Sequence, residues 1–265
     1  MILLAFILGA IFGSFISVLV YRTQHQTKLG LLSRSICPAC KTKISPHHLI
    51  PVISYLLLGG KCASCKKKIA AQYLMVEIFT GTLFALAYAQ WSFLELGAEV
   101  TFLIPELALF VYHVIVFIFL SAIFFYDLAY KIIPDRFSIP AIVLAAAGGL
   151  LLQTVPPIEM LIGGVGIFLF FAAQFFISQG RWIGGGDLRL GALMGVLLGW
   201  KLGLLALVLS YFIGALVAIP LLLNKKANRK TQLPFGPFLI AGTLVALFHG
   251  QSILSWYLNG LLFYA

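Results

Sequence analysis

The sequence predicts an all-α polytopic membrane protein with about eight transmembrane helices and a small cytoplasmic zinc-ribbon loop domain. Its 265 residues are 62% hydrophobic and only 10% charged, whereas soluble domains are about 45–50% apolar and about 25% charged. The apolar residues form long blocks instead of the alternating pattern of a membrane β-barrel. All four cysteines lie in one lysine-rich loop. Together these observations exclude a soluble globular domain, a disordered chain and a coiled coil.

The apolar blocks predict the transmembrane helices, because a helix needs about 20 apolar residues to cross a bilayer. The blocks are residues 2–20, 72–91, 107–126, 137–153, 158–178, 190–200, 203–223 and 235–258. The short sixth block predicts a helix that is tilted or shielded by its neighbours. No basic residue precedes the first block, so no secretory signal peptide is expected. The expected domains are a first transmembrane helix at 1–21, a four-cysteine zinc-binding loop at 22–71 and a seven-helix membrane domain at 72–265.

The basic residues predict the orientation in the membrane. Seventeen of the 18 lie in alternate connections between the blocks, and only Lys201 falls on the other side. The connection 92–106 has three glutamates and no basic residue. The positive-inside rule therefore places both termini outside and the four basic loops in the cytoplasm. This topology explains the net charge of +10, so contact with anionic lipids is expected and nucleic-acid binding is not.

The cysteine pattern predicts a metal site. The thiols form two C-x-x-C pairs, Cys37 with Cys40 and Cys62 with Cys65, and each pair is followed by Lys-x-Lys-Ile. Two such turns form a tetrahedral zinc site, although the gap between the pairs is one residue longer than usual. Two disulfides or four free thiols are the alternatives, and a reducing cytoplasm argues against disulfides. The zinc is expected to be structural, because four thiolates leave no open coordination position.

Four acidic residues lie in or beside the apolar blocks, toward the predicted cytoplasmic side: Glu77, Asp127, Asp135 and Asp187. Ionisable groups in such places are costly and usually functional. Asp127 ends a long apolar run, and Asp187 follows three glycines that permit close backbone approach. Two neighbouring carboxylates share a proton. The ionised one takes a proton from water while the protonated one polarises a carbonyl, so the pair predicts aspartyl hydrolysis.

Each acidic residue also has a purely structural interpretation. Asp187 fits the N-cap of the sixth block, and Asp127 fits an anchor at the membrane interface. Asp135, which has basic neighbours on both sides, fits a turn residue and helix cap. For Glu77, a role near the site and an interhelical hydrogen bond remain equally open.

Small residues repeat every fourth position in two of the blocks. They are Gly9, Gly13 and Ser17 in the first block, and Gly191, Gly195 and Gly199 in the sixth. Such stripes let helix backbones approach closely in a membrane. We therefore expect both stripes to be packing faces and not binding sites.

Taken in order, these motifs resemble those of the type IV prepilin peptidases, which are membrane GxGD aspartyl proteases. The resemblance rests on Gly13-Ser14-Phe15 with Tyr21-Arg22, the two cysteine pairs, Pro51 to Leu56, Val76-Glu77 with Gly81, Asp127 with Ile133-Pro134-Asp135, Gly184 to Asp187, and Leu233 to Phe238. One departure is Ser17, where the family usually has Asn. The resemblance implies that Asp127 and Asp187 form the catalytic pair and that Asp135 does not belong to it.

The resemblance also implies a substrate and a second activity. The family removes the short basic leader of type IV prepilin or pseudopilin precursors at the cytoplasmic face of the bacterial inner membrane. Members with the cysteine loop commonly also methylate the new N-terminus with S-adenosylmethionine. Residues 22–71 are too few for a Rossmann methyltransferase, so an S-adenosylmethionine site would have to be formed by loops and span ends.

Two other functions remain as alternatives. One is an ion- or proton-coupled transporter with a zinc-ribbon regulatory loop, and the other is a membrane scaffold for pilus assembly. Transporters usually carry polar groups near the bilayer midplane on broken helices, often within an internal repeat. Here the acidic residues gather at one side and the two halves show no repeat, which favours the peptidase.

Overall fold

The computed structural model describes residues 1–26, 35–37, 39–91, 94–96, 100–102, 104–223 and 233–262. Several charged residues used to predict the orientation lie outside these ranges, namely Lys28, Arg34, Glu99, Lys225, Lys226, Arg229 and Lys230. The chain forms two compact units, Met1–Phe125 and Tyr126–Ala265, and each is described by itself. The predicted division into a first helix (1–21), a cysteine loop (22–71) and a seven-helix domain (72–265) stays a prediction.

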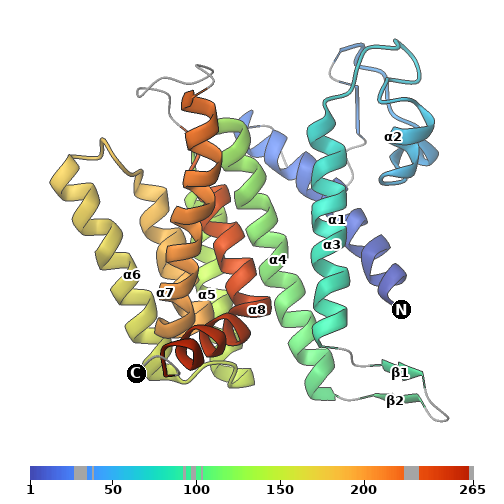
Figure 1. The fold of residues 1–265 in the computed structure, drawn as a ribbon. Coiled ribbons are helices and arrows are strands. Elements are labelled where there is room, and N and C mark those ends of the chain that lie inside the picture. The colour runs from blue at the N-terminus through green and yellow to red at the C-terminus, as the bar shows by residue number, and fades with distance from the viewer. Residues whose placement is uncertain are drawn as a thin grey trace. The chain divides into compact units, whose positions relative to one another are not determined.

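Seven helices in the described part of the chain are long and apolar enough to cross a membrane. They are α1 (Ile2–Gln24), α3 (Ala71–Gln90), α4 (Ile104–Tyr130), α5 (Asp135–Leu152), α6 (Pro157–Ser178), α7 (Gly185–Leu223) and α8 (Gly236–Leu262). The all-α membrane fold predicted from the sequence is thereby confirmed (Figure 1).

The predicted blocks 190–200 and 203–223 both lie within α7. This helix is interrupted at Gly199, whose φ of 72° and ψ of −179° are not helical. A methyl group added at Gly203 would lie 3.5 Å from the Cα of Gly195, so the chain folds back and the two runs lie side by side. The eight predicted blocks therefore correspond to eight helical runs, two of which are joined at this break.

In the unit Met1–Phe125, α1 packs closely against α3. A Cβ added at Gly9 would lie 2.6 Å from the carbonyl oxygen of Thr80, and one added at Gly13 would lie 2.7 Å from the Cα of Glu77. The Ser17 hydroxyl, which is buried, donates a hydrogen bond to the Gly13 carbonyl at 3.1 Å. The predicted packing face of the first block is confirmed, because the small residues permit this contact.

Two connections complete this unit. Between α3 and α4, the described residues form an antiparallel pair of strands, β1 (Leu94–Leu96) and β2 (Val100–Phe102), which the sequence did not predict. Between α1 and α3 lie the 3₁₀ helix η1 (Pro46–Leu49), the short helix α2 (Ile53–Leu57) and the two cysteine pairs.

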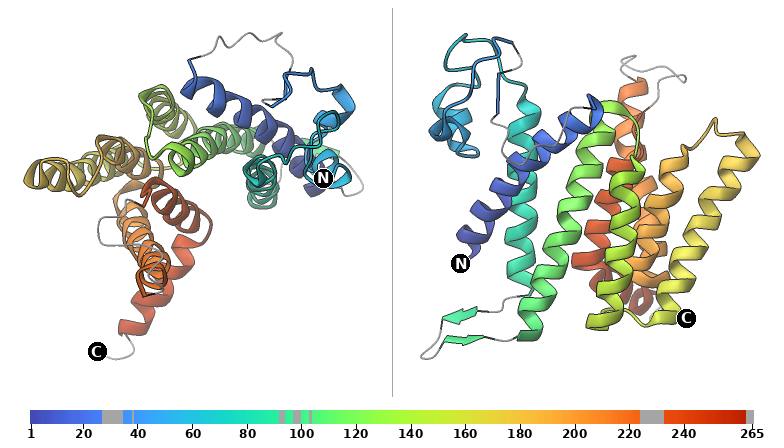
Figure 2. Two further views of the ribbon diagram at one scale, coloured as in Figure 1. Left: turned by 90° about the horizontal axis from the view of Figure 1, so that it is seen from above. Right: turned by 180° about the vertical axis from the view of Figure 1, so that it is seen from behind.

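In the unit Tyr126–Ala265, α7 packs against α5, α6 and α8, and Figure 2 shows this bundle from above and from behind. The contact with α6 is the tightest, because a Cβ added at Gly195 would collide with the backbone of Gly163. A Cβ at Gly191 would lie 2.5 Å from the ring of Phe171. The predicted packing face at Gly191 and Gly195 is confirmed, whereas Gly199 forms the break in α7.

Gly163→Ala is expected to destabilise the protein by about 1–3 kcal/mol, the usual cost of overpacking. The added methyl group would lie 2.6 Å from the Gly195 carbonyl oxygen and 2.8 Å from the Trp200 backbone nitrogen. Gly166→Ala in the same helix is the matched control, because a Cβ there meets nothing within 4 Å. The check is the unfolding free energy of both variants in detergent; equal stability would contradict the close packing.

Candidate active site and metal centre

Asp127 lies in the last turn of α4 and is 4% exposed. Its Oδ2 accepts a hydrogen bond at 2.9 Å from the backbone N–H of Gly236, the first residue of α8. The positive end of the α8 dipole therefore faces this carboxylate. A negative charge in the last turn of α4 is unfavourable for that helix. The stability of α4 thus does not explain an acid here, and its burial does not fit an anchor exposed to the membrane interface.

Asp187 is the third residue of α7 and is 9% exposed. Its Oδ2 accepts the N–H of Gly184 at 3.0 Å, and its own N–H donates to the Gly184 carbonyl at 3.1 Å. The carboxylate thus accepts a backbone N–H at the helix start, as in a capping box, but Asp187 lies inside α7 and not at the N-cap position considered from the sequence. The carboxylate is also close enough to Asp127 for the two charges to interact. A cap alone does not require such a neighbour.

Ile133, in the connection between α4 and α5, packs against the first residues of both α7 and α8. A Cβ added at Gly186 would lie 2.6 Å from the Ile133 Cβ, and one added at Gly236 would lie 3.2 Å from its Cδ1. The Gly236 Cβ would also lie 2.7 Å from Asp127 Oδ2. Both glycines are therefore needed for close approach. Of the glycines before Asp187, Gly185 has nothing within 4 Å of such a Cβ, so the sequence argument about three glycines applies mainly to Gly186.

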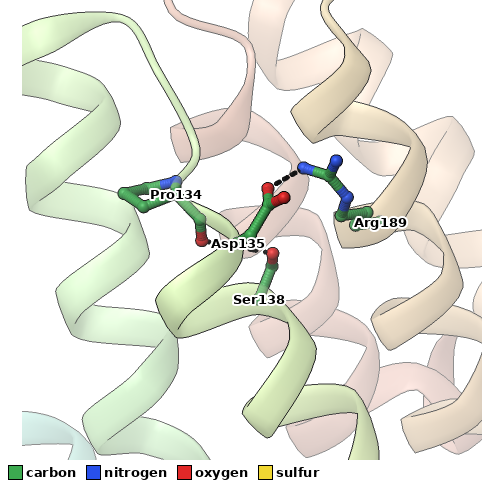
Figure 3. A network of polar contacts seen from close by, with 4 residues as sticks. All are labelled: Pro134, Asp135, Ser138 and Arg189. Atoms are coloured by element: carbon green, nitrogen blue, oxygen red, sulfur yellow. Dashed lines mark hydrogen bonds and ion pairs between the residues drawn. The ribbon is translucent and has the colours of Figure 1, made fainter.

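Asp135 forms an ion pair with Arg189, which lies on α7 two residues after Asp187 (Figure 3). The sequence places basic neighbours on both sides of Asp135 in the chain but does not predict this contact with Arg189. Asp135 is the first residue of α5, while Pro134 occupies the N-cap position and accepts a hydrogen bond from Ser138 Oγ at 3.2 Å. Because both charged side chains are at least a third exposed, the pair contributes about 0–1 kcal/mol.

Glu77 belongs to the unit Met1–Phe125, where it is buried in α3. Its Oε2 accepts the backbone N–H of Val52 at 2.7 Å. Of the two roles left open for Glu77, the interhelical hydrogen bond is present, because the Glu77 side chain also hydrogen-bonds the side chain of Ser14 in α1. The bond to Val52 in addition joins α3 to the loop before α2. The hydrogen bond between Val52 and Glu77 could not be predicted from the sequence, because residue types do not reveal the turn at Val52.

The four cysteines form one cluster. All four sulfur atoms lie within 4.8 Å of one another, and Cys37 Sγ is 4.0 Å from Cys65 Sγ. A tetrahedral zinc ion with bonds of about 2.3 Å holds its sulfurs about 3.8 Å apart, whereas a disulfide needs about 2.05 Å. The cluster therefore fits four ligands of one ion better than two disulfides.

The internal repeat in the sequence explains how the cluster forms. The Cys37 N–H donates to the Thr42 carbonyl at 3.0 Å, and the Cys62 N–H donates to the Lys67 carbonyl at 2.9 Å. The turns are closed by equivalent lysines with positive φ, Lys41 at 59° and Lys66 at 57°. Hydrogen bonds from Thr42 lower the pKa of the Cys40 thiol to about 6, which favours the thiolate that binds metals.

Comparison with known proteins is consistent with these features. Residues 7–91 match the bacterial Peptidase A24 N-terminal domain, and residues 114–219 match the type IV leader peptidase family. A prepilin leader peptidase/N-methyltransferase of Bacillus subtilis is 32% identical over 260 residues, which cover 98% of each chain. Proteins of the same name from Legionella pneumophila and Pseudomonas aeruginosa are 30% and 29% identical, covering 89% and 97% of this chain and 79% and 93% of theirs. No solved structure matches. Because the similarity extends over nearly the whole length, the chain belongs to the type IV leader peptidase family.

Proposed function

We propose that this protein is a membrane aspartyl endopeptidase that removes the short basic leader from type IV prepilin or pseudopilin precursors, with Asp127 and Asp187 as its catalytic pair. The observation that carries the proposal is the pair itself. Two buried carboxylates, each held by a backbone N–H at the start of a helix, lie close enough for their charges to interact. Family membership supplies the reaction class, and the names of the relatives supply the substrate class.

The chemistry follows from two carboxylates that share one proton. The ionised carboxylate takes a proton from a water molecule, whose oxygen attacks the carbonyl carbon of the scissile peptide bond. The protonated carboxylate donates its proton to the carbonyl oxygen. Collapse of the tetrahedral intermediate then breaks the C–N bond, and the leaving nitrogen takes a proton from the pair. The N–H groups of Gly236 and Gly184 each hold one carboxylate oxygen, so both acids are oriented before substrate binds.

The cysteine cluster is proposed to hold a structural zinc ion through Cys37, Cys40, Cys62 and Cys65. The sulfur distances and the donor set support this assignment. Bound zinc would supply folding free energy to the loop, and the hydrolysis needs no metal. The relatives' names include an N-methyltransferase activity, so we also propose that the protein methylates the new N-terminus, with S-adenosylmethionine as the methyl donor.

Co-expression with a prepilin tests the function. Mass spectrometry of the pilin is expected to find the leader removed and, where methylation occurs, one added methyl group on the new N-terminus. A catalytically silent scaffold or an ion- or proton-coupled transporter would leave the precursor intact. None of the relatives compared above is named as a transporter. An uncut precursor beside abundant, membrane-inserted protein would refute the proposal.

The orientation is proposed to place the catalytic pair on the cytoplasmic side of the inner membrane, as the distribution of basic residues indicates. In a variant without the four native cysteines, Val155→Cys is expected to react with a membrane-impermeant maleimide added to intact cells. Lys131→Cys, at the opposite end of α5, is expected to react only after the cells are permeabilised. Labelling of position 131 in intact cells would reverse the topology.

A further inference from the structure

An exposed apolar patch lies in the loop between α1 and α3, outside the helices that are long enough to cross a membrane. Its members project from η1, α2 and the turn between them, and they are Leu49, Ile50, Ile53, Leu56 and Leu57. Leu57 is 82% exposed and Leu56 is 64% exposed. Within α2, the spacing of three and four residues places Ile53, Leu56 and Leu57 on neighbouring parts of one face. Leu49 and Ile50 add exposed apolar side chains from the residues just before the turn.

The composition around the patch is unusual for a soluble loop. Residues 46–60 contain no Lys, Arg, Asp or Glu, and residues 22–71 contain no acid at all. Six exposed lysines flank the uncharged stretch on both sides: Lys41, Lys43, Lys61, Lys66, Lys67 and Lys68. An apolar stretch of about 10–14 residues is too short to cross a bilayer and is typical of interfacial segments.

A hydrogen bond fixes the depth of the patch relative to the membrane helix beside it. The Val52 N–H donates to Glu77 Oε2, and Glu77 lies six residues after the start of α3. At 1.5 Å per residue, this contact is about 9 Å along the helix from its first residue. Figures 1 and 2 both show α2 beside the N-terminal part of α3 and not beyond its end. Interfacial helices bury their apolar faces to a depth of about 5–10 Å.

The backbone at this contact is held in an uncommon conformation. Val52 has a φ of 62° and a ψ of −55°, and the Ile53 N–H donates to the Pro51 carbonyl at 2.6 Å. These features define a γ-turn of the strained kind, which is rare for a β-branched residue. The Glu77 carboxylate accepts the hydrogen bond of this turn, which ties the start of α2 to α3.

We propose that the apolar patch is an interfacial anchor that inserts into the cytoplasmic surface of the bilayer, with the flanking lysines in contact with anionic lipid headgroups. Charge complementarity selects the occupant, because six lysines without an acid attract an anionic surface. The depth set by Glu77 places the apolar side chains at the level of the acyl-chain boundary. The anchor would hold the cysteine loop against the membrane, and it does not depend on the proposed peptidase activity.

Tryptophan reporters in the full-length protein test the anchor. Leu57→Trp lies on the patch, and Ser64→Trp, at an exposed position between Cys62 and Cys65, is the matched control. Both are reconstituted in nanodiscs of phosphatidylcholine and phosphatidylglycerol with brominated acyl chains, and the emission of the parent protein, which has four tryptophans, is subtracted. The added emission at position 57 is expected to be blue-shifted and strongly quenched, and that at position 64 to be unquenched.

Two outcomes would overturn the anchor. Unquenched, red-shifted emission at position 57 would mean that the patch lies in water, and blue-shifted emission without quenching would mean that protein covers it. In discs of phosphatidylcholine alone, the quenching is expected to fall, and equal quenching would overturn the role of the lysines. Adding Glu77→Ala to Leu57→Trp should also reduce the quenching, whereas Glu77→Gln, which keeps an acceptor oxygen for Val52, should preserve most of it.

Discussion

Asp127→Asn and Asp187→Asn are each expected to abolish leader removal while the protein stays in the membrane at normal abundance. An asparagine keeps the shape of the side chain and an oxygen that still accepts the N–H of Gly236 or Gly184. It removes the group that exchanges protons with water and the peptide, a function worth about 10²–10⁴-fold in rate for a single general acid or base. The measurement is the fraction of co-expressed prepilin that is cleaved, together with the thermal stability of each purified variant.

Asp135→Asn is the matched control for this experiment. Its carboxylate is also near the start of a helix, but it is exposed and pairs with Arg189. Losing that pair costs about 0–1 kcal/mol, so most of the cleavage activity should remain. Substantial cleavage by the Asp187→Asn protein, or equal loss of activity in all three variants, would rule out Asp127 and Asp187 as the catalytic pair.

The purified protein is expected to hold about one zinc ion per chain, the stoichiometry of a site with four cysteine ligands, and the double variant Cys62→Ser/Cys65→Ser should release it. Structural zinc in small domains contributes about 10–16 kcal/mol of apparent binding free energy. Without zinc, the loop between α1 and α3 should therefore become sensitive to protease. Elemental analysis and limited proteolysis of the full-length protein provide the measurements.

The two histidines between the cysteine pairs provide the control for the zinc experiment. His47→Ala/His48→Ala should keep the zinc, because the cluster of candidate ligands in the described residues consists of the four cysteines alone. Cleavage by the cysteine variant should fall only in part, since the hydrolysis needs no metal, in contrast to the complete loss expected for Asp187→Asn. A protein without zinc whose native thiols all react freely would count against the metal centre.

Much of the fold could be predicted because its signals are local in the sequence. Each apolar block is a property of about 20 consecutive residues, and every predicted block corresponds to a helical run. The cysteine turns were also predictable, because a C-x-x-C pair and the residues that follow it form their own hydrogen bonds. The small-residue stripes at Gly9 and Gly195 predicted packing faces, although the sequence did not say which helix each would contact.

For the acidic residues, the sequence predicts which side chains matter but not which groups they contact. Asp127 and Asp187 were identified from their types and their positions beside apolar runs. Their hydrogen-bond partners depend on how helices pack, and the N–H that holds Asp127 comes from Gly236 at the start of another helix. The same applies to the ion pair between Asp135 and Arg189, because residue type alone favoured the basic neighbours in the chain.

Hydropathy, charge and cysteine spacing in the chain thus decide which segments are helices that can enter a membrane, where the cysteines cluster and which acids are candidates for catalysis. Tertiary packing alone decides that α7 breaks and folds back at Gly199, that Ile133 packs against the starts of α7 and α8, and that Glu77 accepts a hydrogen bond from the turn at Val52. The physical reason is distance along the chain. Hydrophobic and turn signals act between near neighbours, whereas these contacts form only after helices from distant segments approach to within a few ångströms.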